Sequence, residues 1–168
     1  MLCVIAKIDA DSRQKLNAIR RCAEQYGAAP KNLHGHITLA SYLNADDHIL
    51  TSECKAVLKG RRSFCVRYDK IEIFSATSMI AATPCKNEML CSVHDSLVSI
   101  SPDLLDKWTR NPVWQPHTTL VCMPDCDLRP VAQAMQAAFS PFTARIEVIE
   151  FSKEVDTGYE IIDAVQLE

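Results

Sequence analysis

The chain has 168 residues, of which 48% are hydrophobic and 23% are charged, and its formal net charge is −3. This length suits one compact domain with a sizeable core, or two small lobes that share a core. The apolar runs are too short to span a bilayer, and the mild negative charge gives no reason to expect tight binding to long nucleic acid. A small nucleotide, or the end of an RNA, is compatible with this charge.

Apolar residues at alternating and helical spacings divide the chain into short strands and helices. The first predicted strand covers residues 2–8. It carries no basic leader and no small-residue cleavage site, so we interpret it as a strand and not as a signal peptide. A helix follows, which Asp9 or Asp11 can cap and which Gly27 is placed to end.

A second strand is predicted from about His36 to Leu43. The next helix begins at Asn44 and ends before Gly60. Three short strands then complete the first half of the chain, at residues 61–68, 70–75 and 79–82.

The second half repeats this order of elements. A helix is predicted to start at Thr83-Pro84, because proline is tolerated in the first helical turn. An irregular connection rich in proline covers residues 101–116. The remaining predictions are a strand at 117–123, a helix that Asp125 or Asp127 caps and that ends near Phe139, strands at 143–152 and 159–167, and a turn at Asp156-Thr157-Gly158.

Both halves thus contain a helix, a strand, a second helix and further strands, which indicates an internal duplication. The letters of residues 70–75 also resemble those of residues 145–152 with a short insertion. We therefore predict an α+β fold in a single domain, residues 1–168, with lobe one at about 1–83 and lobe two at about 84–168. Each lobe is a mostly antiparallel sheet with outer helices, and the two lobes flank a central cleft.

Two short segments share one pattern. His36-Ile37-Thr38-Leu39 opens one apolar strand, and His117-Thr118-Thr119-Leu120 opens another. Residues i and i+2 of a strand point to the same face, so each segment places an imidazole beside a hydroxyl. One copy is most often a histidine on a half-buried strand, but two copies in one chain favour a shared function.

The paired His-x-Thr segments, one in each half of the chain, resemble the motifs of the two-histidine (2H) phosphoesterase superfamily, especially its 2′-5′ RNA ligase-like branch. The resemblance implies two lobes with one motif at the centre of each. It also implies cyclic phosphodiesterase or 2′-5′ RNA ligase-like activity. The sequence departs from a common tendency of that family, because Val121 and Cys122 follow the second motif where an arginine or lysine is frequent.

The chemistry of a ribose phosphodiester fits these residue types. A nucleophile must lose a proton, a leaving oxygen must gain one, and the phosphoryl oxygens need hydrogen-bond donors. His36 and His117 are the candidate catalytic residues, since one imidazole can be neutral while the other is protonated near neutral pH. Thr38 and Thr119 are the candidate substrate-binding residues, because their hydroxyls can donate to non-bridging oxygens. Which histidine is acid and which is base stays open.

Three further residues have two interpretations each. Lys7 interrupts the apolar first strand and either contacts a phosphate or reaches solvent. Tyr42 is predicted on the same strand face as Thr38, and Trp114 lies shortly before the second motif. Each of these aromatic side chains either stacks on a base or packs within the protein.

A metal site is the weaker alternative. His34 and His36 form a His-x-His pair that can bind zinc, but the sequence places no third ligand. We therefore expect no metal and no cofactor. The eight cysteines include no Cys-x-x-Cys pair, which favours reduced thiols and a cytoplasmic location.

The leading hypothesis is a metal-independent phosphoesterase that acts on 2′,3′-cyclic phosphates or 2′-5′ bonds of RNA ends or small nucleotides. A non-catalytic protein that binds RNA or nucleotides with the same fold is the second hypothesis, and a zinc-dependent hydrolase is the third. We expect a monomer with no membrane partner. The physiological substrate and the direction of the reaction, hydrolysis or ligation, stay open.

Overall fold

The fold is built on one antiparallel sheet, whose strands follow the order β2-β1-β6-β3-β4-β5, with β7 paired to β6. A computed structural model describes residues 1–155 and 158–168. The strands are β1 (Leu2–Ile8), β2 (His36–Tyr42), β3 (Phe64–Phe74), β4 (Met79–Pro84), β5 (Thr118–Cys122), β6 (Phe142–Val155) and β7 (Gly158–Gln166). The α-helices are α1 (Ala10–Arg20), α2 (Asp47–Leu58), α3 (Glu88–Val98) and α4 (Leu128–Ala138). The predicted turn at Asp156-Thr157-Gly158 falls on residues 156–157, outside the described part of the chain.

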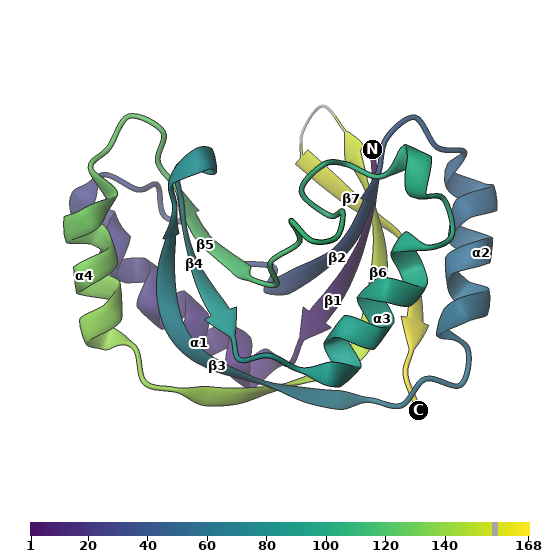
Figure 1. Cartoon of the computed structure of the whole chain (residues 1–168). Coiled ribbons are helices and arrows are strands. Elements are labelled where there is room, and N and C mark those ends of the chain that lie inside the picture. The colour runs from purple at the N-terminus through teal and green to yellow at the C-terminus, as the bar shows by residue number, and fades with distance from the viewer. Residues whose placement is uncertain (156–157) are drawn as a thin grey trace.

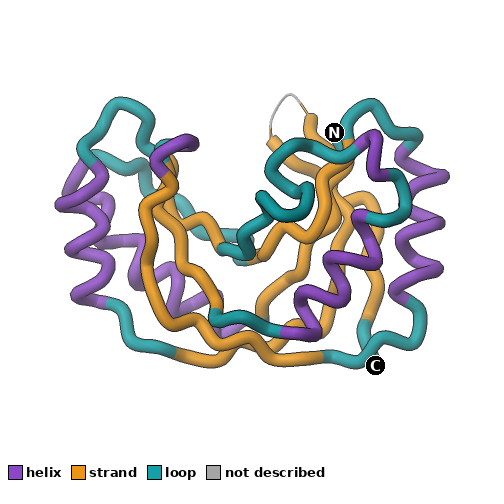
Figure 2. Tube along the Cα trace, viewed as in Figure 1, coloured by secondary structure: helices purple, strands orange, loops and turns teal. Residues whose placement is uncertain are grey.

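The sheet is strongly curved and rises into two arms, with the helices on its outer side (Figure 1; Figure 2). One arm, called lobe one from here on, consists of β2, β1, β7 and most of β6, and α2 and α3 pack against it. The other arm, lobe two, consists of β3, β4 and β5, and α1 and α4 pack against it. The predicted α+β class with two antiparallel lobes and outer helices is confirmed, and the lobes are arms of one sheet.

Each arm contains segments that are far apart in the sequence. The first part of β6, Phe142–Ile146, pairs with Phe64–Tyr68 of β3 and joins the two arms. The rest of β6 turns to lobe one and pairs with β1 and β7. The division of the sequence into halves at about residue 83 therefore stays a prediction about duplication and does not describe which strands share an arm.

Side-chain caps explain where the helices begin. Asp9 accepts a hydrogen bond from the Ser12 amide at 2.9 Å, as predicted for the first helix. The other N-caps are Asp46, Asn87 and Asp127. The first helix ends in a 3-10 turn, Arg21–Tyr26, followed by Gly27 with φ of 94°, a conformation that suits glycine.

Two predicted helix starts are wrong. The second helix begins after Asp46 and not at Asn44, whose φ of 53° is left-handed and precedes the helix. The third begins after Asn87, because Pro84 still belongs to β4, where it pairs with Tyr68. In both cases a residue further along offers its side chain to the first free amides of the helix.

The two strands predicted at 61–68 and 70–75 are one strand, β3. Its first part pairs with β6 and its second part pairs with β4, with a register shift between Tyr68 and Lys70. The shift interrupts the alternation of apolar residues, and for that reason the sequence pattern is broken at Asp69.

A buried chain of hydrogen bonds ties the arms together at their base. Thr118 Oγ1 donates to the carbonyl oxygen of His36 at 2.9 Å, which links the first residues of β5 and β2. Tyr68 is fully buried, and its hydroxyl donates to Thr118 Oγ1 at 2.6 Å. Burial raises the pKa of Tyr68 above its ordinary value, so the phenol keeps the proton that this bond requires.

We expect Tyr68→Phe to lower the free energy of unfolding by about 1–3 kcal/mol, because it leaves the buried Thr118 hydroxyl without its donor. Urea denaturation measures the change. Tyr159→Phe is the matched control, since Tyr159 is 64% exposed, and it should change stability by no more than about 0.5 kcal/mol. Equal midpoints for both variants would contradict the role of this hydrogen bond.

Among the residues that the structure describes, none of the helices combines the length and the apolar character needed to traverse a lipid bilayer.

Candidate active site

Both motif strands contain a bulge at the same place. In lobe one, Thr38 pairs with Ile5 while Ala40 pairs with Val4, so Leu39 is an extra residue. The sequence alternation therefore changes phase directly after Thr38.

Lobe two repeats this geometry. Thr119 pairs with Ala81 while Val121 pairs with Ile80, so Leu120 is the extra residue. The leucine that closes each four-residue motif is thus the bulged residue in both arms. This agreement extends the duplication from the letters of the motif to its backbone.

The bulge explains why the predicted strand face of Tyr42 is wrong and why, of the two interpretations of this residue, packing within the protein is the correct one. After Leu39 the strand faces are exchanged, so Tyr42 points into the core instead of sharing the face of Thr38. Its side chain is fully buried, and its hydroxyl donates to the carbonyl oxygen of Leu97 at 2.7 Å. Tyr42 packs between β2 and α3 and is not available to stack on a base.

The helix-free side of the sheet carries the four motif side chains, and we call it the motif face. Ile37 and Leu39 are fully buried in the core beneath the helices, so His36 and Thr38 point the other way. In lobe two the buried residue is Thr118, and its neighbours His117 and Thr119 are half-buried on the opposite side. Since Thr118 also bonds the backbone of His36, the structure brings the two motifs together where β2 and β5 begin.

His117 is held in one orientation. Its Nδ1 donates to the carbonyl oxygen of Gln115 at 2.7 Å, which leaves Nε2 free of that bond. Its ring lies 4.6 Å from the ring of Phe74, centroid to centroid. Burial lowers the pKa of His117 below its ordinary value, and the hydrogen bond to Gln115 opposes this only in part.

His36 is the more strongly perturbed of the two imidazoles. Burial, together with the positive charges of His34 and His117, lowers the pKa of His36 to about 4, against the opposing charge of Glu150. Its Nδ1 is buried and has no hydrogen-bond partner among the described residues. A pKa of about 4 makes the neutral imidazole the main form of His36 at pH 7, and this form can accept a proton.

A buried carboxylate lies beside His36. Glu150 is 5% exposed and accepts from Lys7 Nζ at 2.7 Å and from His34 Nε2 at 2.5 Å. Burial alone would raise the pKa of Glu150, but the hydrogen bonds from Lys7 and His34 outweigh it and lower that pKa. Lys7 pairs with His36 across β1 and β2, so this ionic group belongs to the motif face.

Glu150 was not among the site residues predicted from the sequence. The one available signal was a charged residue inside an apolar strand, in the dipeptide Ile149-Glu150 that matches Ile71-Glu72 of the duplicated segment. Lys7 was identified as a phosphate contact or a solvent-facing lysine. The structure adds that its ammonium is held by a carboxylate of another strand.

Trp114 closes the open edge of β2. Its Nε1 donates to the carbonyl oxygen of Thr38 at 2.9 Å, and its ring stacks on His94 at 3.7 Å with an angle of 5° between the planes. The amide of Asp106 donates to the carbonyl oxygen of Ser41 on the same edge. The irregular connection therefore donates hydrogen bonds to carbonyl oxygens of β2, an edge strand whose backbone groups would otherwise be exposed. A role of Trp114 in stacking on a base stays a prediction.

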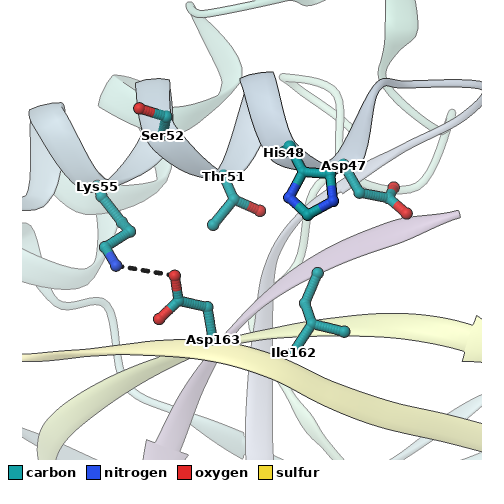
Figure 3. Close-up of a pocket in the computed structure, with 7 residues that line it drawn as sticks. All are labelled: Asp47, His48, Thr51, Ser52, Lys55, Ile162 and Asp163. Carbon is teal, nitrogen blue, oxygen red and sulfur yellow. Dashed lines mark hydrogen bonds and ion pairs between the residues drawn. The ribbon is translucent and has the colours of Figure 1, made fainter.

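A pocket between α2 and β7 lies on the other side of the sheet (Figure 3). Its ionic groups are already paired, with Lys55 Nζ 2.8 Å from Asp163 and Lys153 Nζ 2.7 Å from Asp47. It shares no residue with the motif face. No group of three or more His, Cys, Asp or Glu side chains in the described part of the chain is arranged to hold a metal ion.

Comparisons with solved structures show the same fold at low sequence identity. TT0787 of Thermus thermophilus matches with a TM-score of 0.72 and 16% identity, over 99% of this chain and 97% of that one. E. coli LigT complexed with ATP matches with a TM-score of 0.70 and 15% identity, over 99% and 96%. LigT complexed with 3′-AMP gives 0.69 and 15%, over 99% and 97%.

A comparison with curated proteins finds no match. The family model described as the 2′-5′ RNA ligase superfamily matches residues 8–158, which include both His-x-Thr motifs and every strand from β2 to β6 in full. The chain therefore belongs to the 2′-5′ RNA ligase superfamily of two-histidine phosphoesterases.

Proposed function

We propose that the protein is a metal-independent phosphoesterase that cleaves 2′,3′-cyclic phosphates or 2′-5′ phosphodiester bonds of RNA ends or small nucleotides. The observation that carries this proposal is the meeting of two His-x-Thr motifs on one face of the sheet, joined by the bond from Thr118 to His36. Structures of the related fold are described as LigT complexes with ATP, NADP+, 3′-AMP and phosphate, which supports a nucleotide as ligand.

In hydrolysis, His36 removes a proton from water as the water oxygen bonds to phosphorus. The bond from phosphorus to the leaving ribose oxygen breaks, and protonated His117 gives that oxygen its proton. Thr38 and Thr119 donate hydrogen bonds to the non-bridging oxygens, where charge accumulates. The same groups exchange roles in ligation, because the reverse reaction passes through the same transition state.

The order of the two pKa values supports this assignment of roles. His36, with a pKa of about 4, gives up its proton first and is the base. The pKa of His117 is also lowered by burial, but the Gln115 carbonyl bound at Nδ1 favours the protonated form of this ring. The acidic proton of His117 is then carried by Nε2.

All four site side chains come from one chain, so we treat the active unit as a monomer. All eight cysteines are free thiols, and we place the protein in the cytoplasm, where thiols stay reduced.

Turnover of a 2′,3′-cyclic nucleotide is expected to be the same with and without a chelator, because both proton transfers use imidazoles. An assay of 2′,3′-cyclic AMP, before and after dialysis against EDTA, measures this. Loss of turnover on dialysis, restored by zinc, would replace the proposal with a zinc-dependent hydrolase. Binding of nucleotide without any turnover would replace it with a non-catalytic binding protein.

A further inference from the structure

Each arm of the sheet carries a glutamate in the same register as its motif threonine. In lobe one, Ile5 pairs with Thr38 on one side and with Glu150 on the other. Residues opposite each other in a sheet point to the same face, so Glu150 and Thr38 share the motif face.

Lobe two has the corresponding row. Ala81 pairs with Thr119 on one side and with Glu72 on the other. Glu72 therefore occupies in lobe two the place that Glu150 occupies in lobe one.

The two glutamates also have matching partners. Glu150 accepts from Lys7 Nζ at 2.7 Å and from His34 Nε2 at 2.5 Å. Glu72 Oε1 accepts from Lys70 Nζ at 2.9 Å, and its Oε2 accepts from the side-chain amide of Gln115 at 3.4 Å.

His34 and Gln115 stand at equivalent positions, each separated from its motif histidine by one residue. Glu72, Lys70 and Gln115 together carry no net charge. In the group formed by Glu150, Lys7 and His34, an imidazole stands where lobe two has the neutral side-chain amide of Gln115. The two arms thus differ at one position beside the reacting groups, where lobe one has a basic imidazole and lobe two has a neutral amide.

We propose that Lys7 and His34, held by Glu150, form a second anion subsite in lobe one, which binds a phosphate group adjacent to the one that reacts. This inference rests on the proposed function, because it assigns that site to substrates with two neighbouring phosphates. Such substrates are RNA ends or nucleotides with a further phosphate, in preference to a cyclic mononucleotide.

The side chains of Lys7 and His34 are accessible to a ligand and can donate hydrogen bonds to it. The side chains of Lys7 and His34 are 36% and 38% exposed, so both are open to a ligand although Glu150 between them is buried. Lys7 keeps two of its three donors, and Nδ1 of His34 is not used by Glu150, so the imidazolium form of His34 can donate from it to an anion. The rings of His34 and His36 are 5.7 Å apart, so one substrate can contact both with neighbouring phosphates.

The buried glutamate fixes these cations in place without cancelling the subsite. A bound lysine or histidine loses less rotamer entropy when it meets the ligand, because Glu150 already restricts it. A charge-assisted bond to phosphate is also stronger than a bond between neutral groups. The neutral group in lobe two lacks this advantage and is the internal comparison.

Isothermal titration with 3′-AMP and with adenosine 3′,5′-bisphosphate tests the subsite without requiring turnover. We expect the wild-type protein to bind the bisphosphate at least ~10-fold more tightly than the monophosphate, the scale of one good charge-assisted contact. Lys7→Gln and His34→Gln should each reduce this ratio about 5-fold or more, with a smaller effect on 3′-AMP itself.

Lys55→Gln and His48→Gln are the matched controls. Lys55 makes an ion pair of similar length with Asp163 outside the motif face, and His48 is exposed on α2. Both controls should keep the wild-type ratio of affinities.

The failure of the subsite differs from the failure of the proposed function. Equal wild-type affinities for the two ligands, or a ratio unchanged in both Lys7→Gln and His34→Gln, overturns the subsite even if cyclic nucleotides are hydrolysed. A preference for the bisphosphate that both variants reduce supports the subsite even if no substrate is turned over. Binding of neither ligand overturns the subsite, and turnover of 2′,3′-cyclic AMP then decides separately on the proposed function.

Discussion

Replacing either motif histidine with alanine is expected to lower kcat/KM for 2′,3′-cyclic AMP at least ~100-fold, the usual scale for a general acid or base. His36→Ala removes the group that takes the proton from water, and His117→Ala removes the group that protonates the leaving ribose oxygen. The double variant should lose little more than the worse single variant, because the two groups act in one step. Steady-state assays of the purified variants measure these ratios.

His48→Ala is the control, since His48 is exposed on α2 and away from the motif face. An aryl phosphodiester separates the two roles, because 4-nitrophenolate leaves without a proton. On that substrate His117→Ala should lose much less activity than His36→Ala. Wild-type rates in the variant that lacks both histidines would contradict the proposed chemistry.

The second large effect concerns pH. We expect a bell-shaped plot of kcat/KM against pH with its maximum on the acidic side of neutrality. Above the pKa that sets the alkaline limb, kcat/KM should fall roughly tenfold for each pH unit. The reason is that burial lowers the pKa of both histidines in the free protein. A plot of kcat/KM against pH, from about pH 3.5 to about pH 9, measures the two limbs.

The direction of each limb follows from the role of the residue. A base is active when neutral, so activity falls as the pH drops through the pKa of His36, about 4. An acid is active when protonated, so activity falls as the pH rises through the pKa of His117, which lies below the ordinary value of about 6.5. The maximum therefore lies between these limits.

The profile of kcat should lie at higher pH than that of kcat/KM. The bound substrate carries a negative charge, which stabilises the protonated form of each imidazole and raises its pKa. Variants in which an exposed Asp or Glu away from the motif face is replaced serve as controls. They should leave the pH limits of both profiles unchanged. A bell centred at about pH 8 for kcat/KM would contradict the burial of the two rings.

The fold was largely predictable because the hydrophobic pattern carries most of it. Alternation located the strands from Leu2 and from His36, and the cap at Asp9 was correct. The errors occur where a local signal competes with tertiary structure. Pro84 suited a helix start by its own preferences, but it continues β4 because Tyr68 of the neighbouring strand pairs with it.

Backbone irregularities limited the prediction of the site. The bulge at Leu39 reverses the strand faces, so counting by twos from Thr38 placed Tyr42 on the motif face when it lies in the core. No residue type marks such a bulge in the sequence, because it arises from the register between two strands. The repeat of this bulge at Leu120 is visible only in the structure.

The ion pairs of the site could not be predicted from the sequence, because they also depend on how the strands pair. Glu150 reaches Lys7 and His34 from the far end of the chain, through the pairing of β6 with β1. The sequence placed His34 and Lys7 near the motif but contained no information on which carboxylate they meet. That pairing follows from the strand order, which periodicity does not specify.

In the proposed mechanism, His36 and His117 hold one anion between them. Titration of the protein with inorganic phosphate, followed through the side-chain nitrogen resonances of its histidines, tests it most directly. We expect that His36 and His117 respond with one common dissociation constant, that both take up protons as phosphate binds, and that His48 does not respond. Resonances of His36 and His117 that stay unchanged at saturating phosphate, or that respond with two unrelated constants, would contradict it.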